Sequence, residues 1–91
     1  MDDNSVLIGQ KPVMSYVLAC LSLFHGGATE ISIKARGKAI NRAVDVAEVT
    51  RHRFMPNLKI QKIGIGTELL SRDQNGGSPL NVSTIEIVFA K

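Results

Sequence analysis

The chain has 91 residues, which suffice for one small domain over residues 1–91 and leave no room for a second hydrophobic core. Its one cysteine, Cys20, excludes an internal disulfide and argues against a cysteine metal cluster. We expect Cys20 to be a small core residue, and the scarcity of cysteine favours a reducing, intracellular compartment. The net charge of +3 is unevenly spread, because eight of the 11 cations and two of the eight acids lie between residues 34 and 62. Such a concentrated positive field is typical of proteins that meet a polyanion, but solvated protein faces also carry it.

The first predicted strand and helix are both apolar. Residues 5–9, SVLIG, form a short apolar run closed by glycine, which predicts a buried strand. Pro12 suits a first helical position, and residues 12–25 are apolar on nearly every side, so we expect a helix buried on more than one side. Its apolar run of about 13 residues is shorter than the roughly 20 that span a bilayer. The preceding MDDNS is acidic where a signal peptide is positive, so we expect neither a membrane span nor a targeting segment.

The second strand and the second helix show clear periodicities. Residues 29–35, TEISIKA, alternate strictly between polar and apolar side chains, which predicts a strand with Ile31 and Ile33 on one face. Gly37 opens a helix that we expect to run to about Phe54 and to stop before Pro56. On a helical wheel its apolar residues share one broad face and most of its polar residues share the other.

The last third of the chain predicts a long hairpin. Residues 57–70 form a strand whose apolar positions change from even to odd numbers, which a β-bulge near Lys62 would explain. Residues 71–79 contain Asn-Gly and predict a turn, and residues 80–91 form the returning strand, in which the apolar positions change again near Ser83. Long strands that bend midway favour a hairpin that protrudes from the sheet.

The predicted order of elements is therefore β-α-β-α-β-β. This order favours the α/β class, more strictly α+β, as a two-layer sandwich in which two helices cover one face of a four-stranded mixed sheet. Because the chain has only three Phe and one Tyr as aromatic residues, we expect its core to be aliphatic.

Four cations, Lys34, Arg36, Lys38 and Arg42, surround the predicted start of the second helix. A right-handed strand-helix-strand crossover places this turn beside the turn at residues 9–11, so two helix N-termini with open N–H groups lie side by side. Without a ligand, each cation opposes the helix dipole by about 0.3–1 kcal/mol. A bound anion is the simplest compensation, so we expect phosphate or nucleic acid here. Ordinary solvated lysines are the alternative.

Three segments, VLIGQKPVMSYV, EISIKARGKAINRAVD and VSTIEI, resemble the Alba family of small chromatin and RNA-binding proteins, which are common in archaea. The resemblance extends from about Val6 to Ile87, and KARGKAI and the G-x-K-P turn are its most specific parts. It implies the β-α-β-α-β-β fold and homodimers that bind double-stranded DNA, and often RNA, with little sequence preference. It also implies a cytoplasmic, chromosome-associated protein without a cofactor.

The residues and the resemblance together imply nucleic-acid contacts by Gln10, Lys11, Lys34, Arg36, Lys38, Asn41, Arg42 and Arg72. The family's first turn usually carries two lysines, whereas this chain has Gln10-Lys11, so half of that contact is missing. Lys11 is then the lysine of this turn on which an acetylase and a deacetylase would act. The family's hairpin arm maps onto roughly residues 68–81, where only Arg72 is basic. The family's helix-end aromatic, which is linked to contacts between dimers, matches Phe54.

Other signals favour structural roles over chemistry. Residues 64–69, GIGTEL, lack the third glycine of a dinucleotide-binding loop and lie inside a predicted strand. His25 and His52 are far apart and have no partner at metal-ligand spacing. Ser15 and Ser22 lie in a buried helix without a nearby base, so neither is expected to be a nucleophile. We therefore expect a protein that is not an enzyme and holds no metal.

Two alternatives to a DNA-coating protein stay open. An RNA-binding subunit of a ribonucleoprotein would use the same basic face, although aromatic side chains that stack on bases are nearly absent there. A small enzyme or sensor for a phosphorylated metabolite would also need anion-binding helix starts, but the sequence offers no enclosed catalytic set. Stoichiometry separates the two classes, because a metabolite site saturates with one ligand whereas a coating protein binds in proportion to polymer length.

Overall fold

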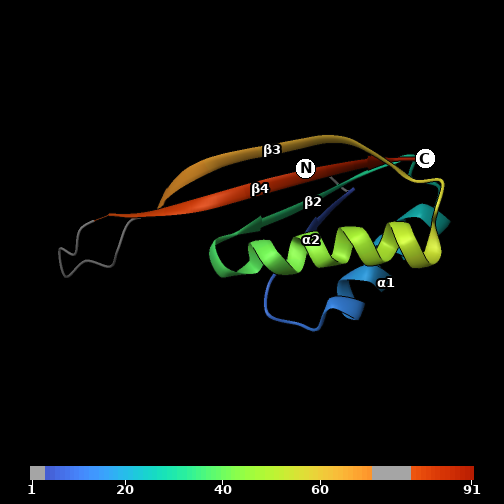
Figure 1. Ribbon diagram of the computed structural model, residues 1–91, viewed down its shortest axis with the longest axis horizontal. Coiled ribbons are helices and arrows are strands. Elements are labelled where there is room, and N and C mark those ends of the chain that lie inside the picture. The colour runs from blue at the N-terminus through green and yellow to red at the C-terminus, as the bar shows by residue number, and fades with distance from the viewer. Residues whose placement is uncertain (1–3, 71–78) are drawn as a thin grey trace.

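The computed structural model describes residues 4–70 and 79–91, which form two α-helices and four strands (Figure 1). In chain order these are β1 (Ser5–Leu7), α1 (Val13–His25), β2 (Glu30–Arg36), α2 (Ile40–Val49), β3 (Lys59–Leu70) and β4 (Leu80–Ala90). A 3-10 turn over Gly37–Ala39 precedes α2, and a π-helical turn over Thr50–Phe54 extends it. Both predicted helices and all four predicted strands are confirmed, with ends that differ by at most two residues when the 3-10 and π-helical turns are counted with α2.

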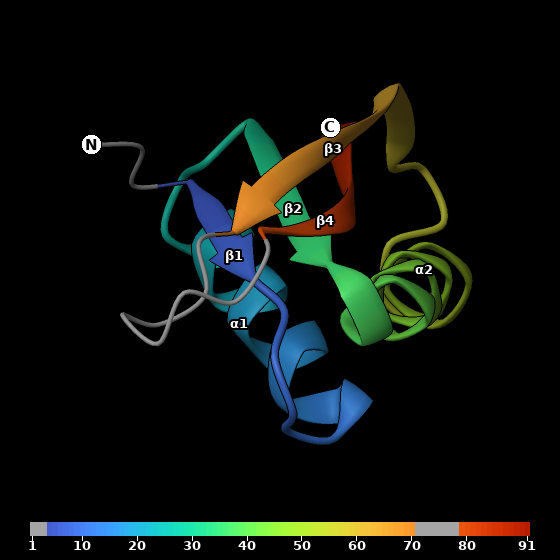
Figure 2. The same ribbon diagram turned by 90° about the vertical axis from the view of Figure 1, so that its left-hand side faces the viewer.

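The four strands form one mixed sheet in the order β1-β2-β4-β3. β1 and β2 are parallel, as expected for strands joined by a helix, and β4 is antiparallel to both of its neighbours. α1 packs against β1 and β2, and α2 packs against β2 and β4, so both helices cover the same face of the sheet (Figures 1 and 2). The predicted two-layer α+β fold is confirmed.

The bend in β3 comes from one extra residue. Its register against β4 shifts between Ile60 and Lys62, so Ile60 pairs with Phe89 and Ile63 pairs with Ile87. Because Phe89 and Ile87 are buried beneath the sheet, both β3 isoleucines turn toward the helix layer although one is even-numbered and the other odd. The predicted bulge is confirmed.

In β4 the apolar positions also change from even to odd numbers, but the cause is different. The pairing of β4 with β3 runs without a register shift through Ser83. Ile85 and Ile87 therefore face the helix layer, whereas Val82 and Leu80 turn to the opposite, open face of the sheet. β3 and β4 also extend past the start of α2, which confirms the protruding hairpin as far as Leu70 and again from Leu80 (Figure 1).

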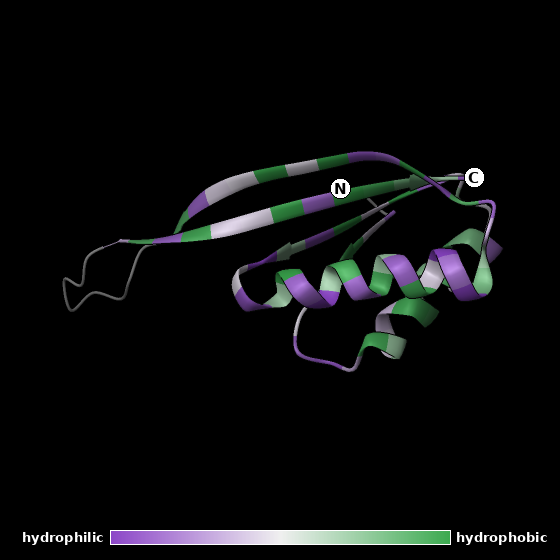
Figure 3. Ribbon diagram, viewed as in Figure 1, coloured by the Kyte–Doolittle hydropathy of each residue, from purple (hydrophilic) through white to green (hydrophobic). Residues whose placement is uncertain are grey.

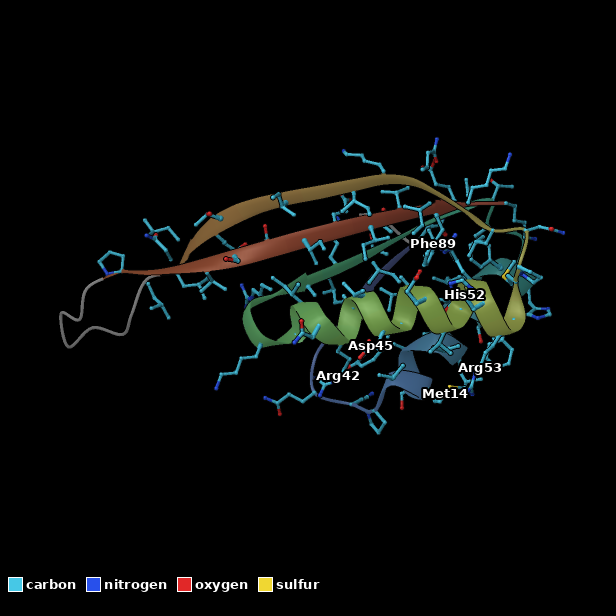
Figure 4. All side chains as sticks on the ribbon, in the orientation of Figure 1. Met14, Arg42, Asp45, His52, Arg53 and Phe89 are labelled. Atoms are coloured by element: carbon cyan, nitrogen blue, oxygen red, sulfur yellow. The ribbon has the colours of Figure 1, made fainter. Side chains whose placement is uncertain are left out.

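The core lies between the sheet and the two helices and is not purely aliphatic. Phe89 is fully buried there (Figure 4) and is the largest fully buried side chain of residues 4–70 and 79–91. Phe24 of α1 is buried in the same core. The core is mainly aliphatic, as expected, but two of the three Phe residues also lie inside it. Cys20 is buried as expected, and its burial raises the pKa of the thiol to about 11.

The two helices differ in how much of their surface the sheet covers. Polar and apolar bands alternate along α2, as its helical wheel predicts (Figure 3). α1 buries Val17, Cys20 and Phe24 but leaves Met14 and Leu18 exposed, so within one chain it is buried on one side and not on several. In residues 4–70 and 79–91 no helix is long and apolar enough to cross a membrane.

Candidate nucleic-acid interface

The two turns that lead from a strand into a helix lie next to each other, as the right-handed crossover predicts. Nη1 of Arg42 donates a hydrogen bond to the carbonyl oxygen of Gly9 at 2.6 Å, across 33 residues of sequence. Figure 4 shows Arg42 on α2, close to the loop that leads into α1. The cations around the start of α2 and Lys11 of the first turn therefore belong to one region of the surface.

Both helix starts keep their positive character. Neither Pro12 before α1 nor Arg36 before the 3-10 turn makes a side-chain capping bond, and neither first turn contains an acid. The first N–H groups of a helix have no partner within the helix, and they carry its positive dipole end. Two such ends side by side form a surface suited to phosphate.

Tyr16 shapes the first turn, a role that was not predicted from the sequence. Its hydroxyl oxygen accepts hydrogen bonds from the backbone N–H of Gly9 at 2.9 Å and of Lys11 at 3.0 Å. The available signal was a lone tyrosine about one helical turn after Pro12. Periodicity places that tyrosine on the helix but says nothing about where its hydroxyl reaches.

Arg36 and Arg42 already have partners within the chain. Nη1 of Arg36 forms an ion pair with Oε1 of Glu68 on β3, and both side chains are about half exposed. Arg42 is half-buried and holds Gly9 as described above. The sequence showed the charge of both residues but not these partners, which lie 32 and 33 residues away.

The other sequence-predicted contacts are arranged in two groups. Gln10, Lys11, Lys38 and Asn41 are exposed at or next to the helix starts, and Lys38 makes no ion pair with any residue in 4–70 or 79–91. Lys34 lies on the open face of the sheet, opposite Glu86 of β4. There it lines a hollow of about 720 Å³ together with Arg36, Lys62, Glu68 and Glu86.

Gly37 makes the sharp turn that directs the chain from β2 into α2. Its φ of +59° is in the left-handed region, which glycine adopts without the steric cost that a Cβ adds. A Cβ at this position would be 3.4 Å from Cγ1 of Val82, which is ordinary van der Waals contact. The backbone angle and not crowding therefore requires glycine here.

We expect Gly37→Ala to lower the free energy of unfolding by about 1–2 kcal/mol, the cost of a left-handed L-residue. Chemical denaturation measures this loss, and Gly64→Ala is the matched control. Gly64 is in a strand without a positive φ, and a Cβ there would meet only Cε of Lys62 at 3.8 Å. Equal losses in the two variants would contradict a requirement based on φ.

Two further predicted residues lie away from the turns. Phe54 ends the π-helical turn and is exposed beside a hollow of about 380 Å³ that Met55, Pro56, Leu58 and Lys91 also line. Its role in contacts between dimers stays a prediction. Arg72 is outside the described residues, so its contribution to the hairpin arm stays a prediction as well.

The histidines take no part in this surface. His52 lies one helical turn from Glu48, and its Nε2 is 3.3 Å from Oε1 of that carboxylate. The hydrogen bond from Arg51, with a smaller contribution from His52, lowers the pKa of Glu48. His25 ends α1 and is exposed. Among residues 4–70 and 79–91, no group of three or more His, Cys, Asp or Glu side chains could hold a metal ion.

The fold and the site thus define a small two-layer α+β domain in which two uncapped helix starts and several cations share one surface that is suited to phosphate. The Alba family model matches residues 4–67. The chain is 56% identical over 91 residues to DNA/RNA-binding protein Alba 1 of Archaeoglobus fulgidus. The alignment covers 100% of this chain and 99% of that protein. This chain belongs to the Alba family.

Further relatives and solved structures agree with this assignment. DNA/RNA-binding protein Alba of Methanocella arvoryzae is 54% identical over 90 residues, covering 99% of this chain and 92% of that protein. Alba from Thermoplasma volcanium superposes with a TM-score of 0.89 at 46% identity, covering 97% of this chain and 100% of that chain. ALBA1 from Trypanosoma brucei superposes with a TM-score of 0.79 at 30% identity, covering 100% of this chain and 71% of that chain.

Proposed function

We propose that this chain is a chromatin protein that coats and compacts double-stranded DNA and also binds RNA. The observation that carries the proposal is the pair of uncapped helix starts joined by the Arg42–Gly9 hydrogen bond, with Lys11 and Lys38 exposed beside them. The relatives named DNA/RNA-binding protein Alba support the same function. The protein acts in the cytoplasm on the chromosome, and it binds nucleic acid without catalysing a reaction on it.

Binding of this kind has little sequence preference. Lysine and arginine side chains and helix N-termini contact phosphate oxygens, which are the same for every base pair. Discrimination between bases needs side chains that reach base edges in a groove. The described surface offers cations at two helix starts and no reading helix, so its contacts position the protein on the duplex without selecting a sequence.

The protein acts as a homodimer, and the exposed apolar side chains support one particular face. Ile63 and Ile65 of the edge strand β3 face the helix layer, but neither helix packs closely beneath β3, and the exposed fraction of Ile65 is 84%. Val44 is exposed on the flank of α2 opposite Arg42. Ile63, Ile65 and Val44 together form an exposed apolar strip, and a second copy of the chain that covers the strip would remove it from water. Met14 and Leu18 of α1 form a smaller exposed pair.

A length titration tests the proposed function. The protein is titrated with DNA duplexes of 15, 30 and 60 base pairs, with an RNA duplex, and with inorganic phosphate and a nucleoside triphosphate. A coating protein binds in proportion to duplex length, and log K falls linearly with log salt. Saturation at one small ligand per chain, with no dependence on polymer length, would instead establish a metabolite-binding protein.

A second candidate, an RNA-binding subunit of a ribonucleoprotein, uses the same surface. The names of the archaeal relatives include RNA as well as DNA, so this candidate also has support. Crosslinking in the native cell followed by sequencing separates the two. Recovery of DNA across the chromosome supports the chromatin role, and recovery of one RNA species supports the ribonucleoprotein role.

Gln10 and Lys11 provide a prediction about charge in the first turn. An acetylated lysine keeps a polar amide and loses its charge, so a glutamine at position 10 resembles a lysine that is permanently acetylated. We expect Gln10→Lys to tighten DNA binding and to steepen the log–log salt slope by about 0.9, the value of one phosphate contact. Lys11→Gln is expected to change both quantities by similar amounts in the opposite direction and to remove the lysine on which an acetylase would act.

Filter-binding or anisotropy titrations at several salt concentrations measure both variants. If Lys11→Gln changes the slope while Gln10→Lys changes neither slope nor affinity, position 10 points away from the nucleic acid. The resemblance of Gln10 to an acetylated lysine would then have no consequence for binding.

A further inference from the structure

The turn between β1 and α1 is held from two sides. On one side Tyr16, from the first part of α1, accepts hydrogen bonds at its hydroxyl oxygen from the N–H groups of Gly9 and Lys11. On the other side Arg42, from α2, donates to the carbonyl oxygen of Gly9. The two hydrogen bonds to the Tyr16 hydroxyl connect the turn to α1, and the hydrogen bond from Arg42 connects the turn to α2. The turn therefore has a defined position relative to both helix starts.

The hydrogen bonds to Tyr16 determine which backbone groups of the turn are left for a ligand. A phenolic oxygen has two acceptor lone pairs, and the Gly9 and Lys11 N–H groups occupy both. Pro12 has no N–H. The N–H of Gln10 makes no hydrogen bond with the rest of residues 4–70 and 79–91. An anion at this turn consequently meets the Gln10 N–H and the side chain of Lys11, and not the N–H groups on either side of Gln10.

The close approach of Tyr16 also explains the glycine at position 9. A Cβ on Gly9 would be 3.2 Å from the Tyr16 hydroxyl oxygen, which is tighter than nine in ten real Cβ contacts. A larger residue at position 9 would require the hydroxyl to shift by a few tenths of an ångström relative to the two N–H groups that it joins. Gly9 and Tyr16 thus form one local unit that is separate from the cations.

Lys11 is restrained on both sides of its Cα. Its N–H is bound to Tyr16, and the next residue is Pro12, whose φ is −59° and whose ring restricts the backbone of the residue before it. A lysine side chain has four flexible torsions, so the position of its backbone decides which phosphate its ammonium group can reach.

We propose that Tyr16 is a positioning residue of the nucleic-acid interface, whose hydroxyl holds the Gly9–Lys11 turn so that Lys11 binds the same phosphate backbone as Lys38. This inference rests on the proposed function. It assigns to Tyr16 an action through Lys11, with no base stacking and no direct role for its ring.

The test compares Tyr16→Phe, Lys11→Gln and the double variant with the unchanged protein. Phenylalanine keeps the ring and its packing and removes only the oxygen. We expect Tyr16→Phe to weaken binding to a 30-base-pair duplex about threefold to eightfold at 0.1 M salt. One phosphate contact contributes about 0.9 to the salt slope, which raises the affinity about eightfold between 1 M and 0.1 M salt. The salt slope should fall by up to about 0.9. Adding Tyr16→Phe to Lys11→Gln should change neither quantity further, because the two act through one contact.

Amide hydrogen exchange provides a readout that needs no nucleic acid. In Tyr16→Phe the N–H groups of Gly9 and Lys11 should exchange faster, while the N–H groups of β2 and β4 keep their protection. If exchange of Gly9 and Lys11 is unchanged, the hydroxyl does not hold the turn and the proposal is wrong. If the turn loosens but affinity and slope are unchanged, or if Tyr16→Phe weakens the Lys11→Gln variant equally, Tyr16 does not act through Lys11 and the proposal is again wrong.

The same measurements separate this inference from the proposed function. If the unchanged protein fails to bind the duplex in proportion to its length, the proposed function fails, and the positioning role toward nucleic acid fails with it. If the unchanged protein binds with its expected salt slope and Tyr16→Phe does not alter that slope, only the inference about Tyr16 is overturned.

Discussion

Replacing Arg36, Lys38 and Arg42 together with alanine is expected to weaken binding to double-stranded DNA by roughly 10²-fold to 10³-fold at 0.1 M salt. Each phosphate contact contributes about 0.9 to the log–log salt slope, so each is worth about eightfold between 1 M and 0.1 M salt. Three contacts then account for the expected range and for a fall in slope of about 2.7 for each protomer on the DNA. The loss should be the same for duplexes of different sequence, because phosphates carry no sequence information.

Arg36 and Arg42 have partners within the chain, but these partners do not prevent either side chain from contacting phosphate. The Arg36–Glu68 pair is about half exposed, and exposed pairs contribute only about 0–1 kcal/mol, so a phosphate can displace Glu68. Arg42 uses one of its N–H donors on Gly9, and a guanidinium has five. Both side chains can therefore contact phosphate.

The matched control removes three cations elsewhere, at Arg51, Arg53 and Lys59. These residues lie after the far end of α2 and at the start of β3, so the net charge changes equally while the helix starts stay intact. Salt-dependent anisotropy titrations compare the two triple variants. A control that loses as much affinity as the cluster variant would show that overall charge, and not this surface, carries the binding.

The structure also changes what we expect for the stability of the cluster variant. From the sequence alone, removing cations from a helix start should leave the fold intact or stabilise it, because those cations oppose the dipole. That reasoning holds for Lys38. Arg42, however, makes a half-buried, charge-assisted hydrogen bond to Gly9, and losing such a bond costs about 1–3 kcal/mol. A modest net loss of stability is therefore expected.

Much of the fold follows from local patterns in the sequence. The strict alternation of residues 29–35 and the single apolar stripe of α2 each reflect a periodicity that only one regular structure satisfies. The bulge in β3 could also be predicted, because an inserted residue is the simplest way to keep both Ile60 and Ile63 on the side of the sheet that faces the helices. β4 shows the same change from even to odd apolar positions, but there the apolar residues change faces while the pairing with β3 stays regular. Parity alone does not distinguish these two cases.

The details of the site were less accessible, because they depend on contacts between residues far apart in the chain. The crossover rule placed the two turns side by side, but it could not show that Arg42 bonds to Gly9 or that Glu68 pairs with Arg36. These partners depend on where β3 and α2 lie in three dimensions. The role of Tyr16 was missed for a similar reason, since its position in α1 is periodic but its hydroxyl acts on the preceding loop. Composition likewise could not show that Phe89 fills the centre of the core.

The exposed apolar strip formed by Ile63, Ile65 and Val44 leads to the second prediction with a large effect. In the unchanged protein, sedimentation at micromolar concentration should give about twice the chain mass of 9.9 kDa. Ile65→Lys places a charge in the centre of the proposed interface, so we expect it to sediment as a single chain. Burying an unpaired ammonium group costs far more than the apolar contact of one isoleucine contributes.

Loss of the dimer in Ile65→Lys should lower the affinity for DNA by about 100-fold. A dimer presents two basic surfaces to one duplex, and linking two binding sites raises the overall affinity by about 10²-fold to 10⁴-fold without any new contact. The direction of this effect is informative, because Ile65→Lys adds a cation and an added cation by itself strengthens binding to a polyanion. A loss of affinity therefore has to come from the loss of the partner chain.

Leu7→Lys is the matched control for this variant. Leu7 is 72% exposed on β1, the opposite edge strand, and shares the open face of the sheet with Lys34. It is thus a large exposed apolar residue outside the proposed interface, and its lysine variant should remain a dimer and bind DNA at least as tightly as the unchanged protein. If Ile65→Lys remains a dimer while Leu7→Lys dissociates, the chains associate through the open face and the assignment to β3 is wrong. If the unchanged protein is a monomer at micromolar concentration, the homodimer itself is wrong, and coating must then proceed through single chains with one basic surface each.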